Sequence, residues 1–460
     1  MQASTAATVT ARLDRLPASR HIWVLVVLLS LGGAFEFYDL FMTGYVSPGL
    51  IHEGIFQAGT KGLFGLTDQA GFASITFAGL FVGTIGFGYV ADRYGRRSIF
   101  TFSLLWYAAA TLIMSAQNTV LWLDFWRFVA GIGIGVELVT IDTYVAELVP
   151  KAVRGRAFAI NQAIQFAAVP IVAWLSFQLV PIDPFGIAGW RWVAALPAVA
   201  AIAVWFIRRA VPESPRWLAQ HGRTAEADRV TAWIEARVAA DIGAKLPPPG
   251  PPAPPERGRA RLSEIFRPPY RRRTIMMIVF QFCQSIGFYG FGNWVPALLA
   301  AQGATVTKSL EYAYIVALAS PTAPLLFVLF ADRLERKWQI CLAACGTACF
   351  GLLFTQASGP AALIGCGVAI TVTNNLLSTS FHTYQAELFP TRVRARAVGF
   401  VYSFSRISTV FSSFMIAFFL QNFGTLGVFG FIGAAMLVVV VAIGGFGPRT
   451  RGLALEDISH

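Results

Sequence analysis

Long apolar runs, separated by short polar stretches, dominate this 460-residue chain. A helix that crosses ~30 Å of hydrocarbon needs about 20 mostly apolar residues, and each of these runs approaches that length. The expected membrane spans are 22–46, 71–91, 98–117, 120–145, 157–180, 190–209, 274–299, 310–331, 338–356, 361–383, 397–421 and 425–446. Because lipid cannot satisfy backbone N–H and C=O groups, each span should be helical. The pattern predicts an all-α membrane protein with twelve transmembrane helices.

Composition supports a membrane protein and argues against other classes. Hydrophobic residues make up 56% of the chain and charged residues only 13%, whereas a soluble domain carries roughly a quarter charged residues. The net charge of +12 comes from short basic clusters between apolar runs, which does not suit nucleic-acid binding. No catalytic triad, metal-ligand cluster or phosphate-binding loop is evident in the sequence, so we expect neither an enzyme nor a bound cofactor or metal. All five cysteines lie inside apolar runs, which favours packing roles.

The basic clusters predict the orientation in the membrane. They follow the second, fourth, eighth and tenth spans, and the loops at the other ends of the spans carry few Lys or Arg residues. By the positive-inside rule, the ends of the even-numbered spans face the cytoplasm. We therefore expect a multi-pass protein of the inner (plasma) membrane with both termini in the cytoplasm.

The stretch between the sixth and seventh spans differs from the rest because it is charged and then proline-rich. It should form a short amphipathic helix near Thr224–Ala239, and the prolines of 247–255 should act as a stiff spacer. The predicted organisation is an N-terminal tail (1–21), a first six-helix bundle (22–209), a cytoplasmic linker (210–273), a second six-helix bundle (274–446) and a C-terminal tail (447–460).

Two motifs recur at an offset of 240 residues. The segment 91–97 (ADRYGRR) matches 331–337 (ADRLERK), and 144–156 (YVAELVP…RGR) matches 384–396 (YQAELFP…RAR). Two separate motifs at one offset indicate an internal duplication. The sequence therefore predicts two pseudo-symmetric six-helix bundles, a layout used by transporters.

At these motifs the sequence resembles the major facilitator superfamily over nearly its whole length. Residues 88–97 are similar to the signature loop of the superfamily, and 127–135, 144–156 and 212–218 (PESPRWL) are similar to its sugar-porter branch. The wider relatives of that branch include bacterial aromatic-acid, niacin and metabolite transporters and animal organic-ion transporters. The chain departs from the sugar-porter pattern in the seventh span, where Gln281 and Gln284 stand three apart.

The resemblance implies a cytoplasmic gate of salt bridges that closes in the outward-open state. Charges that belong only to solvated loops are the alternative. The residues expected in this gate are Asp92, Arg93, Arg96, Arg97, Glu147, Arg154, Asp332, Arg333, Glu387 and Arg394.

Charged residues inside spans are costly and usually functional. Asp39 should lie ~25 Å from the start of the first span and Arg127 ~10 Å from the start of the fourth. These spans run in opposite directions, so the two residues should lie at about the same depth. The pair resembles the proton-coupling Asp/Arg pair of sugar/proton symporters, and a fixed structural salt bridge is the alternative. Glu36, on nearly the same helix face as Asp39, is a second candidate for the titrating group.

Arg406 should lie near mid-membrane in the eleventh span, where a guanidinium suits a carboxylate substrate. It resembles the span-11 cation of organic-anion transporters, and pairing with an internal acid such as Glu137 is the alternative. The other expected substrate contacts are polar or aromatic residues near mid-span: Gln162, Gln165, Gln281, Gln284, Tyr289, Asn374, Tyr38 and Tyr402.

The sequence thus predicts a secondary transporter, working by alternating access, that carries a small organic acid together with protons. An aromatic or heteroaromatic carboxylate is favoured over an aliphatic one. A sugar or polyol symporter, or a facilitative or exporting transporter of organic ions, is the alternative. The expected partners are the solute, protons and the lipid bilayer, and the protein is expected to be a monomer.

Overall fold

The computed structural model describes residues 2–57, 67–208, 211–251, 262–268, 270–325, 334–389 and 391–450, and every regular element in these ranges is a helix. By length and composition alone, eight of these helices could cross a membrane. The last, α17 (Thr391–Phe446), has 56 residues and breaks at Gly424, where φ is 63°. At 1.5 Å per residue it would extend about 84 Å, so it forms two crossings rather than one.

The first half of the chain contributes six crossings. Its helices are α2 (Arg20–His52), α3 (Asp68–Tyr94), α4 (Arg96–Ser115), α5 (Val120–Leu148), α6 (Arg154–Phe166), α7 (Ala168–Leu179) and α8 (Gly189–Arg208). The fifth crossing is divided between α6 and α7 at Ala167. The glycines of α5 explain how it packs so closely on α3, because a Cβ at Gly131 would lie 2.4 Å from the Thr76 carbonyl oxygen. Small residues allow this backbone approach between membrane helices.

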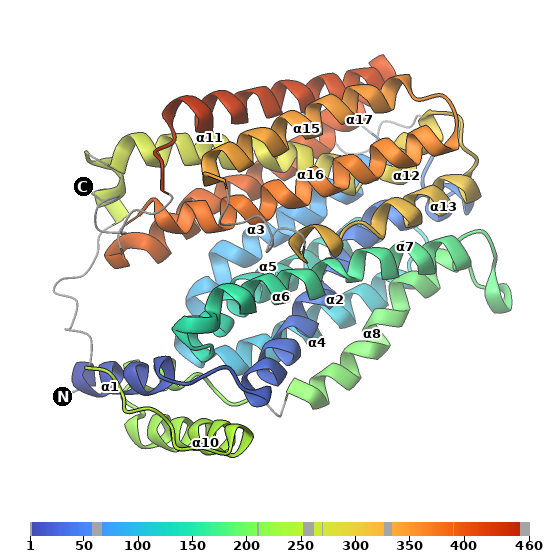
Figure 1. The fold of residues 1–460 in the computed structure, drawn as a ribbon. Helices are drawn as coiled ribbons and strands as arrows, with labels where there is room; N and C mark the ends of the chain where they lie inside the picture. The colour runs from blue at the N-terminus through green and yellow to red at the C-terminus, as the bar shows by residue number, and fades with distance from the viewer. Residues whose placement is uncertain are drawn as a thin grey trace.

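The second half repeats the arrangement. Its helices are α11 (Tyr270–Gly292), α12 (Val295–Ala301), α13 (Val306–Ala317), α15 (Arg336–Gln356), α16 (Pro360–Glu387) and α17. In Figure 1 the blue-to-green helices of the first half and the yellow-to-red helices of the second form two groups. Helices α3 and α17 pack against each other across the boundary between the halves. The fold is therefore the twelve-span, two-bundle architecture expected from the sequence.

A cap of three helices covers one end of the first bundle. It consists of α1 (Gln2–Asp14), α9 (Pro215–Gln220) and α10 (Thr224–Ile242), and α1 and α10 lie side by side (Figure 1). Helix α10 confirms the amphipathic helix predicted within 210–273. Helix α1 was not expected, because residues 1–21 were predicted only as a tail. We call the end of the molecule next to this cap the linker end and the opposite end the far end.

Ion pairs hold the cap together. Arg12 of α1 and Arg15, the residue directly after that helix, contact Glu235 of α10 at 2.7 and 2.6 Å. Burial raises the pKa of the Glu235 carboxyl, but the hydrogen bonds and charges of the two guanidinium groups outweigh that effect and hold this pKa below its usual value. The cap thus joins the start of the chain to the linker.

The two halves touch closely at the far end. A Cβ at Gly44 of α2 would lie 1.9 Å from the carbonyl oxygen of Asn293, and a Cβ at Gly292 would lie 2.6 Å from the Phe41 ring. Both contacts join α2 to the C-terminal part of the seventh crossing. The structure is therefore closed at the far end.

Replacing Gly44 by Ala should open the far end, because the added methyl group cannot fit against the Asn293 carbonyl. We expect a single cysteine at Tyr45→Cys, in a cysteine-free background, to react several-fold faster with a membrane-impermeant maleimide. Gly433→Ala is the control, because a Cβ there meets nothing within 4 Å. Equal labelling rates in the two glycine variants would contradict the close approach.

Candidate functional site

Asp39 and Arg127 form a buried ion pair at the expected place. Arg127 Nη1 lies 2.6 Å from Asp39 Oδ2, and the two side chains are 0% and 3% exposed. The other guanidinium nitrogens donate to Thr76 Oγ1 at 2.9 Å and Thr43 Oγ1 at 2.7 Å. The pair joins α2 to α5, and α3 contributes Thr76.

Further contacts complete the surroundings of this pair. Thr111 Oγ1 donates to Asp39 Oδ1 at 3.1 Å, so a hydroxyl from α4 holds the second carboxylate oxygen. The Arg127 guanidinium also lies 5.6 Å from the centre of the Phe72 ring. None of these threonines was among the predicted site residues. Thr43 alone could have been found, because it stands four residues after Asp39 on the same helix face.

Among the other buried acids of the first half, Glu36 and Glu137 lie in different surroundings. Glu36 is 1% exposed on α2. Glu137 is fully buried on α5 and accepts a 3.4 Å hydrogen bond from Ser103 Oγ of α4. Glu137, the acid expected as the alternative partner of Arg406, is thus hydrogen-bonded within its own bundle.

Arg406 lies at the boundary between the halves and is held by two tyrosines. Its Nη1 donates to Tyr289 Oη at 2.9 Å and its Nη2 to Tyr402 Oη at 3.2 Å. The side chain is buried, and within the described part of the chain its Nε has no hydrogen-bond partner. Arg406 and the two tyrosines are all predicted substrate residues, and the structure brings the three together.

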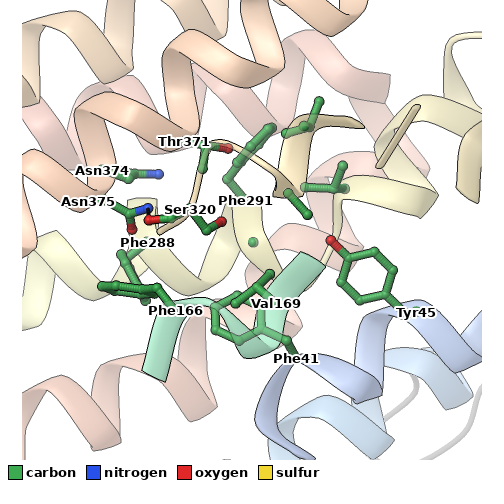
Figure 2. A pocket seen from close by; sticks show the side chains of 14 residues that line it. Phe41, Tyr45, Phe166, Val169, Phe288, Phe291, Ser320, Thr371, Asn374 and Asn375 are labelled. Atoms are coloured by element: carbon green, nitrogen blue, oxygen red, sulfur yellow. Dashed lines mark hydrogen bonds between the residues drawn. The ribbon is translucent and has the colours of Figure 1, made fainter. Parts of the chain in front are cut away.

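A small cavity of about 30 Å³ lies between the halves. It is lined by Phe41, Tyr45, Phe166, Val169, Phe288, Phe291, Gly292, Val295, Val316, Ala317, Ser320, Thr371, Asn374 and Asn375. Figure 2 shows polar groups of the second half on one side, with Phe41, Phe166 and Val169 of the first half opposite. About 10–15 Å³ holds one water, so this cavity must widen before it admits an organic solute.

Through the internal repeat, Arg406 corresponds to a residue of the first half that lines this cavity. Phe166 stands 240 residues before Arg406, which is the offset of the internal duplication. Phe166 lines the cavity and contacts Phe288 with 6.0 Å between ring centroids. The position of Arg406 in the second bundle therefore corresponds to a position in the first bundle that faces the central path.

The Asn and Gln side chains predicted to bind substrate have different hydrogen-bond partners. Asn374 lines the cavity, with Nδ2 donating to the Gly287 carbonyl at 3.3 Å. Gln281 and Gln284 bond each other at 3.1 Å, and Gln281 also donates to Gln385 at 2.9 Å. These two glutamines are thus engaged within the second half.

The remaining glutamines lie on α6. Gln162 Nε2 donates to Ser378 Oγ of α16 at 3.4 Å, so it bridges the two halves. Gln165 Nε2 donates to Asn161 Oδ1 at 3.4 Å on its own helix. Gln162 is therefore the better placed of the two to sense movement between the halves.

Tyr38 is hydrogen-bonded within the first bundle. Its hydroxyl donates to the Val193 carbonyl of α8 at 2.9 Å, and the residue is buried. Its role as a substrate contact stays a prediction.

Two matching ion pairs lie at the linker end. Arg96 Nη2 lies 3.3 Å from Glu147 Oε1 in the first half, and Arg336 Nε lies 2.7 Å from Glu387 Oε1 in the second. Each pair joins two helices of one bundle, and the two pairs are related by the 240-residue offset. Arg336 was not among the predicted gate residues, although its repeat partner Arg96 was.

The other predicted gate residues have different partners. Arg154 contacts Asp14 of α1 at 3.3 Å, and the same carboxylate contacts Arg216 at 2.8 Å. The backbone N–H groups of Arg96 and Arg97 donate to the Glu213 carboxylate at 3.0 and 3.3 Å. Burial raises the pKa of that carboxyl.

Some gate residues have no described side-chain contacts with the gate. Arg93 is exposed and its guanidinium lies 5.6 Å from the centre of the Tyr94 ring. The side chains of Asp92 and Arg394, and the whole of Asp332 and Arg333, lie outside the described residues. The gate therefore remains a prediction for these four residues.

The two six-helix bundles are related by an internal duplication, and charged side chains are buried in the region where they meet. This arrangement defines a polytopic membrane transporter. The chain belongs to the sugar (and other) transporter family, a branch of the major facilitator superfamily, and the family model matches residues 25–460. This family consists of transporters and not of enzymes.

Individual relatives cover almost the whole chain. The putative metabolite transport protein YyaJ of Bacillus subtilis is 31% identical over 96% of this chain and 95% of its own. The niacin transporter NiaP of Acinetobacter baylyi is 26% identical over 97% and 99%. A partially occluded, inward-open structure of the xylose transporter XylE from Escherichia coli superimposes with a TM-score of 0.75 at 19% identity, covering 95% of this chain and 100% of that one. That structural similarity supports the fold.

Removing Arg127 should destabilise the protein, because it leaves Asp39 as a buried unpaired charge. We expect Arg127→Gln to lower the free energy of unfolding by about 3–5 kcal/mol. Unfolding in detergent micelles, followed by circular dichroism, measures this. The double variant Asp39→Asn, Arg127→Gln should lose less, since no charge is then left unpaired.

The matched control is Lys308→Ala, which breaks the exposed 2.7 Å pair between Lys308 and Glu311. Its unfolding curve should match that of the unmodified protein. An Arg127→Gln variant as stable as this control would show that the buried pair does not stabilise the fold.

Proposed function

We propose that this transporter carries a small aromatic or heteroaromatic carboxylate into the cell together with protons. The observation that carries the proposal is Arg406, a buried guanidinium at the boundary between the halves whose recorded hydrogen-bond acceptors are two tyrosine hydroxyls. Hydroxyl acceptors carry no charge, so they do not neutralise a buried cation, which is costly to bury. A carboxylate ligand would supply both the charge and a second acceptor, and Arg binds carboxylates with paired hydrogen bonds.

The cavity favours a planar ring. Phe41, Phe166, Phe288 and Phe291 line it, and aromatic faces stack on aromatic ligands. Asn374 and Tyr402 would supply hydrogen bonds to ring substituents. The niacin transporter among the relatives carries a ring of this kind, which agrees with the proposal.

A sugar or polyol symporter is the second candidate. It is supported by the arabinose-proton symporter of Bacillus subtilis, which is 26% identical over 96% of this chain. The amides most suited to sugar hydroxyls, Gln281 and Gln284, are bonded to each other and to Gln385. A buried arginine also has less to gain from a neutral sugar than from an anion, so we place this candidate second.

For coupling, we propose that Asp39 binds and releases the proton and that Arg127 controls when it does so. While the pair is closed, the guanidinium occupies Asp39 Oδ2; when the helices move apart, that oxygen becomes free to bind a proton. Protonation then biases the equilibrium between the two open states. We further propose that the linker end, with its basic clusters, faces the cytoplasm and that the transporter works as a monomer in the inner membrane.

Asp39→Asn should abolish concentrative uptake, because the amide cannot carry a proton across the membrane. In proteoliposomes with an imposed pH gradient, labelled nicotinate or benzoate should equilibrate without accumulating, while exchange of internal for external solute continues. Glu311→Gln, at an exposed site, is the control and should accumulate solute normally. Accumulation by Asp39→Asn equal to that of the control would exclude Asp39 as the coupling site.

Arg406→Gln should remove carboxylate binding. Losing a buried charged partner costs about 2–5 kcal/mol, or roughly thirtyfold or more in Kd. Thermal-shift titration of the purified protein with nicotinate, benzoate, xylose and arabinose measures this. Arg223→Gln, in an exposed ion pair of the linker, is the control. If carboxylates stabilise Arg406→Gln as well as the control, or if only the sugars stabilise either protein, the proposed substrate class is wrong.

A further inference from the structure

A stripe of exposed residues runs along α10, the helix of the cap that contacts the start of the first crossing. Arg229, Trp233 and Arg237 stand four residues apart, so they share one face of α10, and all three are exposed. The Arg237 guanidinium lies 5.6 Å from the centre of the Trp233 ring. The stripe therefore places an aromatic ring between two positive charges.

Contacts with α2 place this stripe beside the surface that faces lipid. The Trp233 ring lies 5.0 Å from the His21 ring between centroids, and the His21 N–H donates to Asp241 Oδ2 at 2.6 Å. Within two turns of His21 along α2, Val24 and Val27 are 43% and 40% exposed. Because α2 is long and apolar enough to cross the membrane, these exposed apolar side chains face lipid. Trp233 thus lies where the first crossing enters the membrane, which is the level that Trp favours.

The acids of α10 are engaged with other groups and do not neutralise the stripe. Their partners lie on α1, on α2 or in the segments beside these helices. The contacts are Glu226 with Arg223, Asp228 with Arg12, Glu235 with Arg12 and Arg15, and Asp241 with the backbone N–H of His21.

Three guanidinium groups near Trp233 are therefore available to a ligand. Arg229 and Arg237 are exposed, as is Arg20, the residue before His21, and the described part of the chain holds no salt bridge of any of the three. Arginine binds phosphate groups with paired hydrogen bonds. At the surface of a membrane, lipid headgroups supply phosphate at high local concentration.

We propose that this face of α10 is a binding site for the headgroup of an anionic phospholipid. Arg229 and Arg237 from α10 and Arg20 from α2 contact the phosphate, and the Trp233 ring lies against the lipid below it. An anionic headgroup is favoured over a zwitterionic one, because choline or ethanolamine would bring a further positive charge to a basic site. The bound lipid joins α10 to α2, so it holds the cap on the first bundle together with the ion pairs of α1.

Quenching of a dye by brominated lipid tests the site on the full-length protein. A single cysteine at the exposed position Ala236→Cys, in a cysteine-free background, carries the dye in proteoliposomes of phosphatidylcholine. A minor fraction of the lipid in both leaflets is brominated and is either phosphatidylglycerol or phosphatidylcholine. We expect brominated phosphatidylglycerol to quench the dye more strongly. In Arg229→Gln, Arg237→Gln, the preference for phosphatidylglycerol should fall about thirtyfold, because each arginine near a membrane adds to the attraction for anionic lipid.

The matched control is Arg223→Gln, Lys308→Gln, which removes the same charge from two exposed ion pairs. It should keep the preference, and so should Arg229→Lys, Arg237→Lys, which retains both charges. Gel filtration establishes that each variant is folded.

Three results would overturn the proposal. Equal quenching by the two brominated lipids in the unmodified protein would show that α10 does not select an anionic headgroup and would leave this face to a soluble partner. An undiminished preference in Arg229→Gln, Arg237→Gln would place the lipid at other residues. Loss of quenching on addition of inorganic phosphate would show that the site takes a soluble phosphate compound instead of a lipid.

Discussion

A guanidinium shielded from water needs acceptors for its donors and a negative charge nearby, and this requirement organises the centre of the protein. Two arginines are buried here, and they meet the requirement in different ways. Arg127 has a carboxylate and two threonine hydroxyls within one bundle. Arg406 donates to two neutral hydroxyls at the boundary between the bundles. The described partners of Arg127 belong to one bundle. The Arg406 site lies at the boundary, so its contacts change when the bundles move.

The two arginine sites should therefore respond to different movements of the protein. The Asp39–Arg127 pair connects helices of the first bundle, so movements within that bundle control it. Tyr289, which accepts a hydrogen bond from Arg406, packs against Phe77 of the first bundle, so movements between bundles affect that site. A transporter that alternates between two open states needs both kinds of contact. The close approach of Gly44 to Asn293 and the small central cavity indicate a state closed at the far end.

Much of this could be predicted from sequence because the strongest signals are physical and local. Apolar runs of membrane length gave the spans, and the 240-residue repeat gave the two bundles. Asp39 and Arg127 could be paired because both are charges inside spans and lie at similar depth. The amide contacts could not be predicted, because spacing along a helix does not say whether Gln281 bonds a substrate or Gln385. The hydrogen bond from Tyr38 to the Val193 carbonyl could not be predicted, because the facing direction of a single aromatic residue has no signal in one sequence. Helix α1 was missed because its stability comes from contacts with a linker over 200 residues away.

We propose that Arg406 anchors a carboxylate between the bundles. A structure of the protein determined by cryo-electron microscopy with nicotinate or benzoate bound would show whether it does. We expect the ligand carboxylate within hydrogen-bonding distance of the Arg406 guanidinium, with the ring among the aromatic side chains of a widened cavity. A ligand bound elsewhere, with Arg406 still bonded only to Tyr289 and Tyr402, would contradict it.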